Sequence, residues 1–150
     1  MNARHPMFSR IELNPGAGGD DRSANDGRLE VHELLGLSIQ SPLIFLSGCE
    51  TALGPSWATS FSRGEDYATM AQAFLYGGAS NVVATLWRIE DEGAAVFTEE
   101  FYGALREGDP AEALATAQRA MMQHPRYRAP FYWAAYQVAG EGLTTFGRRN

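Results

Sequence analysis

The stretch Leu-Ile-Phe-Leu-Ser-Gly-Cys-Glu-Thr-Ala-Leu-Gly, residues 43–54, decides how the rest of the chain is interpreted. Its first four residues form an uninterrupted apolar run between Pro42 and Ser47, which is typical of a fully buried parallel strand in an α/β fold. Cys49, the only cysteine of the chain, follows this run by three residues. Sites in open α/β sheets are built at the carboxyl ends of strands. The sequence therefore predicts that Cys49 lies at such an edge.

Two interpretations of Cys49 are open at this point. As a nucleophile, its thiol would face a substrate that Gly48, having no side chain, allows to come close. As a structural residue, it would be buried, because free cysteines are among the most buried residues of proteins.

The residues after the cysteine predict a second parallel strand. Apolar residues recur at helical spacing over 67–75 and stop at Gly77-Gly78, and a further apolar run covers 81–87. One crossover helix between two such strands predicts a right-handed βαβ unit. The carboxyl ends of both strands, with Cys49 and Trp87, are then expected at the same edge of the sheet.

Other patterns predict the remaining elements. They are a strand over 9–13, an exposed loop over 15–26, a helix over 29–35, helices over 92–106 and 110–123, a strand or short helix over 131–138, and a frayed tail over 144–150. Within the first helix, Val31, Leu34 and Leu35 are expected on one apolar face and His32 in solvent. Asp109 is the predicted N-cap of the last long helix, and His124 at its end is expected to contact terminal carbonyls.

Several of these segments carry a family resemblance. Ser-Gly-Cys-Glu-Thr-Ala-Leu-Gly, residues 47–54, resembles the cysteine motif of the CHAT family, which comprises caspase-like peptidase domains often found beside TPR repeats in bacterial proteins. Further similar segments are 5–13, 26–29, 33–37, 71–75, 77–79, 82–87 and 131–136. The resemblance implies a caspase-like three-layer sandwich with a mainly parallel sheet. Residues 1–150 would form the later part of that domain, incomplete at its N-terminal side.

The resemblance also implies a catalytic arrangement. The family uses a Cys/His dyad whose histidine ends an earlier strand and is followed by glycine, and Cys49 matches the nucleophile, with its backbone N–H as an oxyanion donor. Gly48, Glu50 and Thr51 would contact the substrate, although Thr51 could equally hold the turn. No residue matches the histidine, because His5 precedes a proline. The chain is therefore expected to be either a piece of a longer gene product or a degenerate family member, inactive by itself.

Two acidic residues follow the second predicted strand. Glu90 and Asp91 could form an acidic floor for a basic substrate side chain, because carboxylates pair well with arginine. Alternatively, they begin and cap the following helix, where negative charge is favoured.

Composition narrows the function classes. The chain has 150 residues, a formal net charge of -6 and one cysteine, so a single globular domain without an intrachain disulfide is expected, and nucleic acid is an unsuitable partner. No segment predicts a membrane span, a metal site, a cofactor or a TPR array, and a cytoplasmic location is expected.

Three functional hypotheses follow. The first is a cysteine endopeptidase domain that cleaves a protein partner in bacterial signalling or defence. The second is a catalytically silent protein-interaction module of the same fold, and the third is a flavodoxin-like small-molecule binder. An incomplete parallel sheet also predicts self-association through an exposed strand edge.

Overall fold

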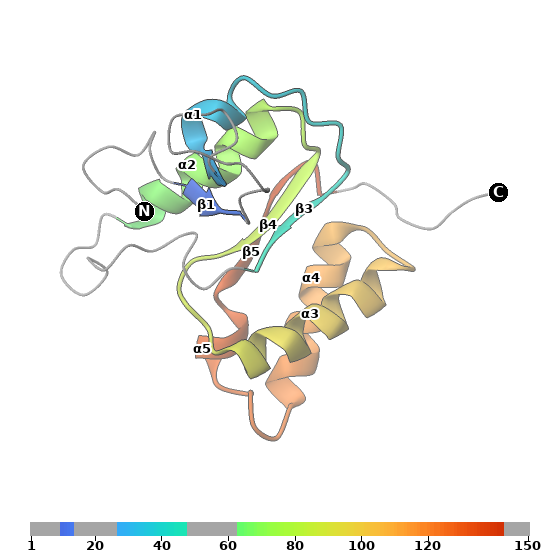
Figure 1. Cartoon of the computed structure of the whole chain (residues 1–150). Helices are drawn as coiled ribbons and strands as arrows, with labels where there is room; N and C mark the ends of the chain where they lie inside the picture. Colours follow the sequence, from blue (N-terminus) through green and yellow to red (C-terminus); the bar gives the residue numbers. More distant parts are fainter. Residues whose placement is uncertain (1–9, 14–26, 48–62, 143–150) are drawn as a thin grey trace.

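The computed structural model describes residues 10–13, 27–47 and 63–142, with only the backbone for 63–69 (Figure 1). Its elements, in chain order, are β1 (Arg10–Glu12), β2 (Arg28–Glu30), α1 (Val31–Leu34), β3 (Ile44–Leu46), α2 (Arg63–Tyr76), β4 (Asn81–Thr85), α3 (Asp91–Leu105), α4 (Pro110–Gln123), α5 (Pro130–Trp133) and β5 (Tyr136–Gly140). The predicted loop over 15–26 and the predicted tail over 144–150 lie outside the described residues.

The main sheet has the strand order β3-β4-β5. β3 runs parallel to β4, with Phe45 beside Val83, as the βαβ prediction requires. β5 pairs with the other edge of β4 in antiparallel orientation. The described residues thus show a mixed α/β fold. One of the two pairings in this sheet is antiparallel, so the mainly parallel sheet of a three-layer sandwich is not confirmed.

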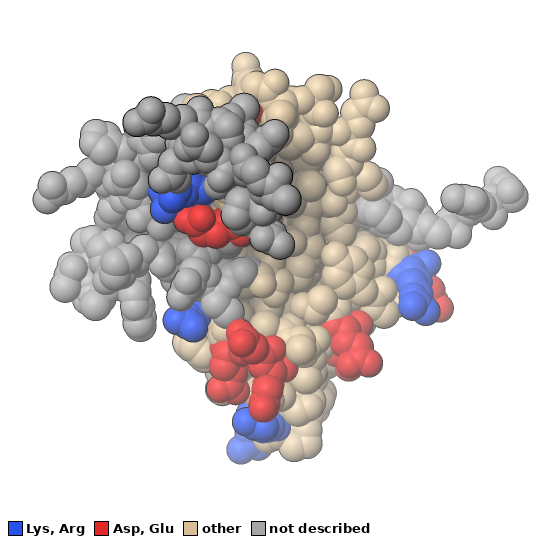
Figure 2. Space-filling view, in the orientation of Figure 1, with Lys and Arg blue, Asp and Glu red and all other residues tan. Residues whose placement is uncertain are grey.

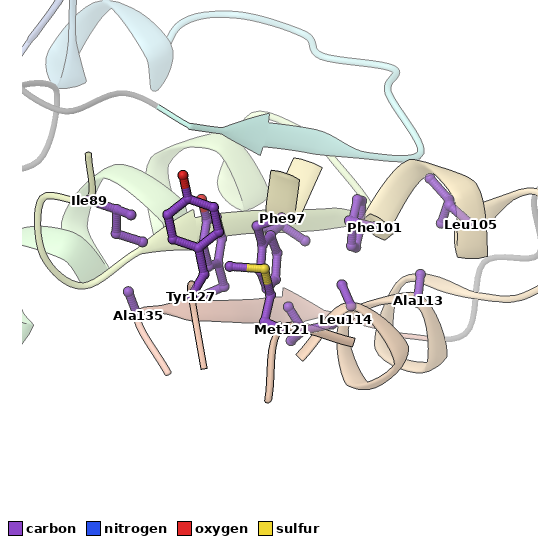
Figure 3. Close-up of a cluster of buried hydrophobic side chains, with 12 residues drawn as sticks. Ile89, Phe97, Phe101, Leu105, Ala113, Leu114, Met121, Tyr127 and Ala135 are labelled. Atoms are coloured by element: carbon purple, nitrogen blue, oxygen red, sulfur yellow. The ribbon is translucent and has the colours of Figure 1, made fainter. Parts of the chain in front are cut away.

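Alternate residues of β4 point into two different cores, because side chains of a strand alternate between the faces of a sheet. Val83 belongs to a cluster built with α3 and α4, part of which is labelled in Figure 3. In this cluster Phe97 stacks on Tyr136 with 3.5 Å between ring centroids. Val82 and Ala84 belong to a second cluster, built with α1 and α2. Helices therefore cover both faces of the sheet.

β3 is less buried than its apolar sequence predicts. Ile44, Phe45 and Leu46 are each half-buried, whereas every residue of β4 is buried. The reason is position, since β4 has a strand on either side and β3 is an outer strand of the described sheet. The prediction of a fully buried strand is wrong in this respect.

Several predicted helix boundaries are confirmed. α2 ends at Tyr76, directly before Gly77, and Gly78 has a φ of 108°. α4 begins at Pro110, and the side chain of Asp109 accepts a hydrogen bond from the backbone N–H of Glu112, as an N-cap does.

Two predictions about the flanking helices are confirmed in part. The segment predicted as a helix over 29–35 begins in β2 and has only one helical turn, α1; Val31 and Leu34 are buried, but Leu35 is 38% exposed. The backbone N–H of His124 donates to the carbonyl of Met121 in the last turn of α4 at 3.0 Å, so the predicted contact with a terminal carbonyl is made by its backbone. Its Nδ1 accepts the backbone N–H groups of Arg126 and Tyr127, both at 3.2 Å, and so holds the turn after α4.

The segment predicted over 131–138 as a strand or a short helix contains parts of both. α5 covers Pro130–Trp133 and β5 begins at Tyr136. The side chain of Gln118 in α4 donates to the carbonyls of Trp133 and Tyr136, at 3.3 Å and 3.2 Å. These bonds hold the connection between the helix and the strand.

Candidate functional site

The predicted site lies where β3 and β4 end. Because the two strands are parallel and Leu46 pairs with Ala84, their carboxyl ends meet at one edge of the sheet. Ser47, which is exposed, is the last described residue after β3. The predicted site residues Gly48, Cys49, Glu50 and Thr51 lie outside the described residues, so their placement stays a prediction.

The exit of β4 is held by the C-terminal part of the chain. The backbone N–H of Leu86 donates to the carbonyl of Ala135 at 2.9 Å. The indole N–H of Trp87 donates to the carbonyl of Phe131 at 2.8 Å, and the two rings stack with 6.4 Å between centroids. Trp87 is therefore fixed between the end of β4 and α5.

The acidic residues after Trp87 surround the start of α3. Glu90 is in the N-cap position without a side-chain capping bond, and Asp91 is the exposed first residue of the helix. Figure 2 shows acidic side chains gathered over this part of the molecule. The alternative that Asp91 begins the helix is confirmed. A substrate contact of Asp91 stays a prediction.

Glu92 is engaged by the turn that follows α4. Its Oε2 accepts a hydrogen bond from the Tyr127 hydroxyl at 3.1 Å and pairs with Arg126 Nη1 at 2.7 Å. Burial, and next the hydrogen bond to Glu92, raise the pKa of Tyr127 above its ordinary value, while Arg126 opposes this shift. Burial and then the charge of Glu90 likewise raise the pKa of Tyr132. The two phenols are therefore held in the neutral form near the start of α3.

Asn81 is a residue that sequence reasoning missed. It is fully buried at the start of β4, where its Nδ2 donates to the carbonyl of Pro42 at 3.0 Å and its Oδ1 accepts the backbone N–H of Gly142 at 2.7 Å. One side chain thus joins the entry to β3 and the exit from β5. An asparagine at the start of an otherwise apolar strand is the signal that could have found it.

The two histidines in the described ranges take part in local structure. His32 is half-exposed and pairs with Glu30, with 3.2 Å between Nδ1 and Oε2, and His124 holds the turn described above. The described ranges contain no group of three His, Cys, Asp or Glu residues arranged to hold a metal ion. Among the helices that the structure describes, none has the length and apolar character needed to cross a bilayer.

Comparison with known proteins gives two matches. A family model described as "CHAT domain" matches residues 1–141. Tetratricopeptide repeat protein 28 from Mus musculus is 27% identical over 116 residues, which is 77% of this chain. The match covers 4% of that relative, so this chain spans only a small part of its length.

Proposed function

Because the chain belongs to the CHAT domain family, we propose that it is the later part of a caspase-like cysteine endopeptidase domain. Cys49 is the nucleophile, and a histidine on a strand from sequence outside this chain completes the dyad. The observation that carries the proposal is the parallel pairing of β3 and β4, whose carboxyl ends share one edge. A residue that closely follows β3 then belongs to the part of the fold where sites are built.

The chemistry needs few groups. The imidazole takes the thiol proton, the thiolate attacks the carbonyl carbon of the scissile peptide bond, and the backbone N–H of Cys49 donates to the oxyanion. The amine leaves with the proton from the imidazolium, and water then hydrolyses the thioester. Without the histidine, a cysteine with an ordinary pKa of about 8.5 is only a few per cent thiolate at neutral pH. The isolated chain is therefore inactive under this proposal.

The substrate is a protein partner, held by Gly48, Glu50 and Thr51 beside the nucleophile and by Asp91 at the start of α3. The exposure of Asp91 supports this role, because the carboxylate can be reached from solvent. A basic substrate side chain would pair with Asp91.

A catalytically silent interaction module of the same fold is the second candidate. The observation that favours it is that both described histidines, His32 and His124, are committed to contacts in their own segments. In that case partners bind around residues 47–51 without being cleaved.

Labelling of Cys49 by an alkylating peptide probe distinguishes the two candidates. The endopeptidase proposal expects labelling in a longer polypeptide that includes an upstream strand ending in His-Gly, and strong loss of labelling when that histidine is replaced by alanine. The isolated chain and Cys49→Ser serve as controls. If the longer polypeptide is not labelled under conditions that label a control cysteine peptidase, the chain is a silent module.

The wider context is also a proposal. The match to a tetratricopeptide repeat protein supports TPR repeats in the same polypeptide or as a partner. A role in bacterial signalling or defence and a cytoplasmic location stay predictions. We also propose self-association through an exposed strand edge.

A further inference from the structure

The turn after α4 is held by a hydrogen-bond acceptor that protonation removes. Nδ1 of His124 accepts the backbone N–H groups of Arg126 and Tyr127, both at 3.2 Å. A ring nitrogen accepts a hydrogen bond only when it carries no proton, so these two bonds require a neutral imidazole with its proton on Nε2. Histidine is the side chain that ordinarily changes its charge between about pH 5 and 8. A fall in pH through this range therefore removes the acceptor of both bonds.

The two residues whose N–H groups bind the imidazole also join the turn to the start of α3. The Tyr127 hydroxyl donates to Oε2 of Glu92 at 3.1 Å, and Nη1 of Arg126 lies 2.7 Å from the same oxygen. Two side chains of one turn thus converge on one carboxylate, and the backbone of both is held by one imidazole. Loss of the bonds to Nδ1 therefore releases the backbone that positions both side chains.

The imidazole is packed against the turn that it holds. The ring of His124 stacks on the ring of Tyr127, with 4.8 Å between centroids and 23° between planes. Tyr127 is buried in the cluster labelled in Figure 3 and meets Tyr132 of α5 edge to face. A flip of the imidazole would keep the stack but place a C–H group against the two N–H groups. The two bonds therefore depend on the charge of the ring and are not restored by a flip.

The charged and titratable groups described around this turn come from three elements. The turn itself supplies Arg126 and Tyr127, the start of α3 supplies Glu90 and Glu92, and α5 supplies Tyr132. Glu92 is paired with Arg126, and Glu90 accepts a hydrogen bond from Tyr132. Burial raises the pKa of both tyrosines, so both phenols stay neutral where histidine titrates. The N–H groups of Arg126 and Tyr127 are thus the contacts that a charged imidazole would repel.

We infer that His124 is a pH-sensitive switch that controls the start of α3. In its neutral form it holds the turn and, through Arg126 and Tyr127, the contacts to Glu92; in its protonated form it releases them. Glu92 directly follows Asp91, which the proposed function assigns to the substrate, so the switch loosens this part of the site as pH falls. The switch itself rests on the contacts of described residues. Only its effect on substrate binding rests on the proposed function.

The test is amide hydrogen exchange of the 150-residue chain at about pH 7.5 and about pH 5, on either side of the ordinary range for histidine. Exchange rates are measured by NMR and divided by those of an unstructured peptide at the same pH. The protection of the Arg126 and Tyr127 amides should fall at least about tenfold at the lower pH, because each loses a hydrogen bond. The Glu112 amide, which donates to Asp109 at the other end of α4, is the internal control and should change little.

Variants separate a switch from a merely structural turn. His124→Asn provides an amide oxygen near the place of Nδ1 that does not titrate, so the Arg126 and Tyr127 amides should stay protected at both pH values. His124→Ala should leave both amides unprotected at either pH. His32→Gln, at a half-exposed histidine that pairs with Glu30, is the matched control and should behave as the wild type does.

The link to α3 has its own reporter in the same experiment. The Ala94 amide donates to the carbonyl of Glu90 at 3.0 Å and so closes the first turn of α3. Its protection should also fall at the lower pH in the wild type, and should not fall in His124→Asn. Unchanged protection of Ala94 in the wild type would contradict control of α3 by the turn.

Two further results would overturn the switch itself. One is equal protection of the Arg126 and Tyr127 amides at the two pH values in the wild type. The other is a pH dependence that persists in His124→Asn. Neither result bears on the labelling of Cys49 in a longer polypeptide, so the switch and the proposed peptidase activity fail separately.

Discussion

β3 and β4 are neighbouring parallel strands with the same apolar character and very different surroundings. Val82 and Val83 of β4 are fully buried, whereas Ile44 and Phe45, their partners in register on β3, are only half-buried. β4 pairs with β3 on one side and with β5 on the other, whereas β3 pairs with only one strand among the described residues. An apolar run therefore predicts that a strand forms. The number of strands paired with it decides how much of its surface is buried.

Disrupting the pairing of β4 with β5 should have the largest effect on stability. Gly140 ends β5 with a φ of 121°, and a Cβ there would overlap the carbonyl oxygen of Ser80. Gly140→Ala is expected to lower the free energy of unfolding by more than about 3 kcal/mol, through backbone strain and steric overlap. Urea denaturation followed by circular dichroism measures this loss.

A second glycine provides the matched control. Gly103 lies in α3, and a Cβ there would meet nothing within 4 Å. Gly103→Ala should therefore raise the free energy of unfolding by up to about 1 kcal/mol, because alanine is the better helix former. Equal effects of the two substitutions would show that Gly140 is not needed for pairing β4 with β5.

Truncating one residue on each strand compares an interior with an outer position directly. Val82→Ala should cost about 2 kcal/mol, since the side chain is fully buried. Ile44→Ala removes a larger side chain but should cost only about 1 kcal/mol in the monomer, because that residue is half-exposed.

The same pair also reports on the edge of β3. If β3 pairs with a second copy, the cost of Ile44→Ala should grow with protein concentration, while that of Val82→Ala measured relative to wild type should not. Urea midpoints at several concentrations give the answer. A larger loss for Ile44→Ala than for Val82→Ala at low concentration would contradict the ranking of the two strands.

The smallest expected effect concerns pH at the exit of β4. Burial raises the folded-state pKa of Tyr127 and Tyr132 above the ordinary value near 10. Above that pH the unfolded chain loses its tyrosine protons before the folded chain does. The contribution of the two tyrosines to the free energy of unfolding is therefore complete below about pH 10 and is lost as pH rises further. Urea midpoints across this range should fall less steeply in Tyr127→Phe/Tyr132→Phe. An unchanged slope in the double variant would contradict the assignment.

Local features of the fold could be predicted because they depend on neighbouring residues. The capping of α4 by Asp109 and the end of α2 before Gly77 follow from side chains and backbone conformations within a few positions. The predicted helix over 92–106 corresponds to α3, where Phe97, Phe101 and Leu105 recur at helical spacing and are all buried.

Predictions that depended on distant partners did worse. The helix predicted over 29–35 is helical only over Val31–Leu34, because Arg28–Glu30 pairs with β1, some 18 residues earlier in register (Leu29 with Ile11). The two backbone N–H groups that donate to Nδ1 of His124 were not predicted, because they depend on the chain turning back toward it at Tyr127. Asn81 was not predicted at all, since its partners at Pro42 and Gly142 are far away in sequence.

The sequence by itself determined the family and the parallel relation of β3 and β4, because motifs and apolar runs are local properties. Only the tertiary structure decided that β4 is interior and β3 is an outer strand, that Trp87 is held by α5, and that Glu92 is paired with Arg126. These contacts join segments that are far apart in the sequence. The burial of a side chain and the partner of a charged group therefore depend on the tertiary structure and not on the adjacent residues in the chain.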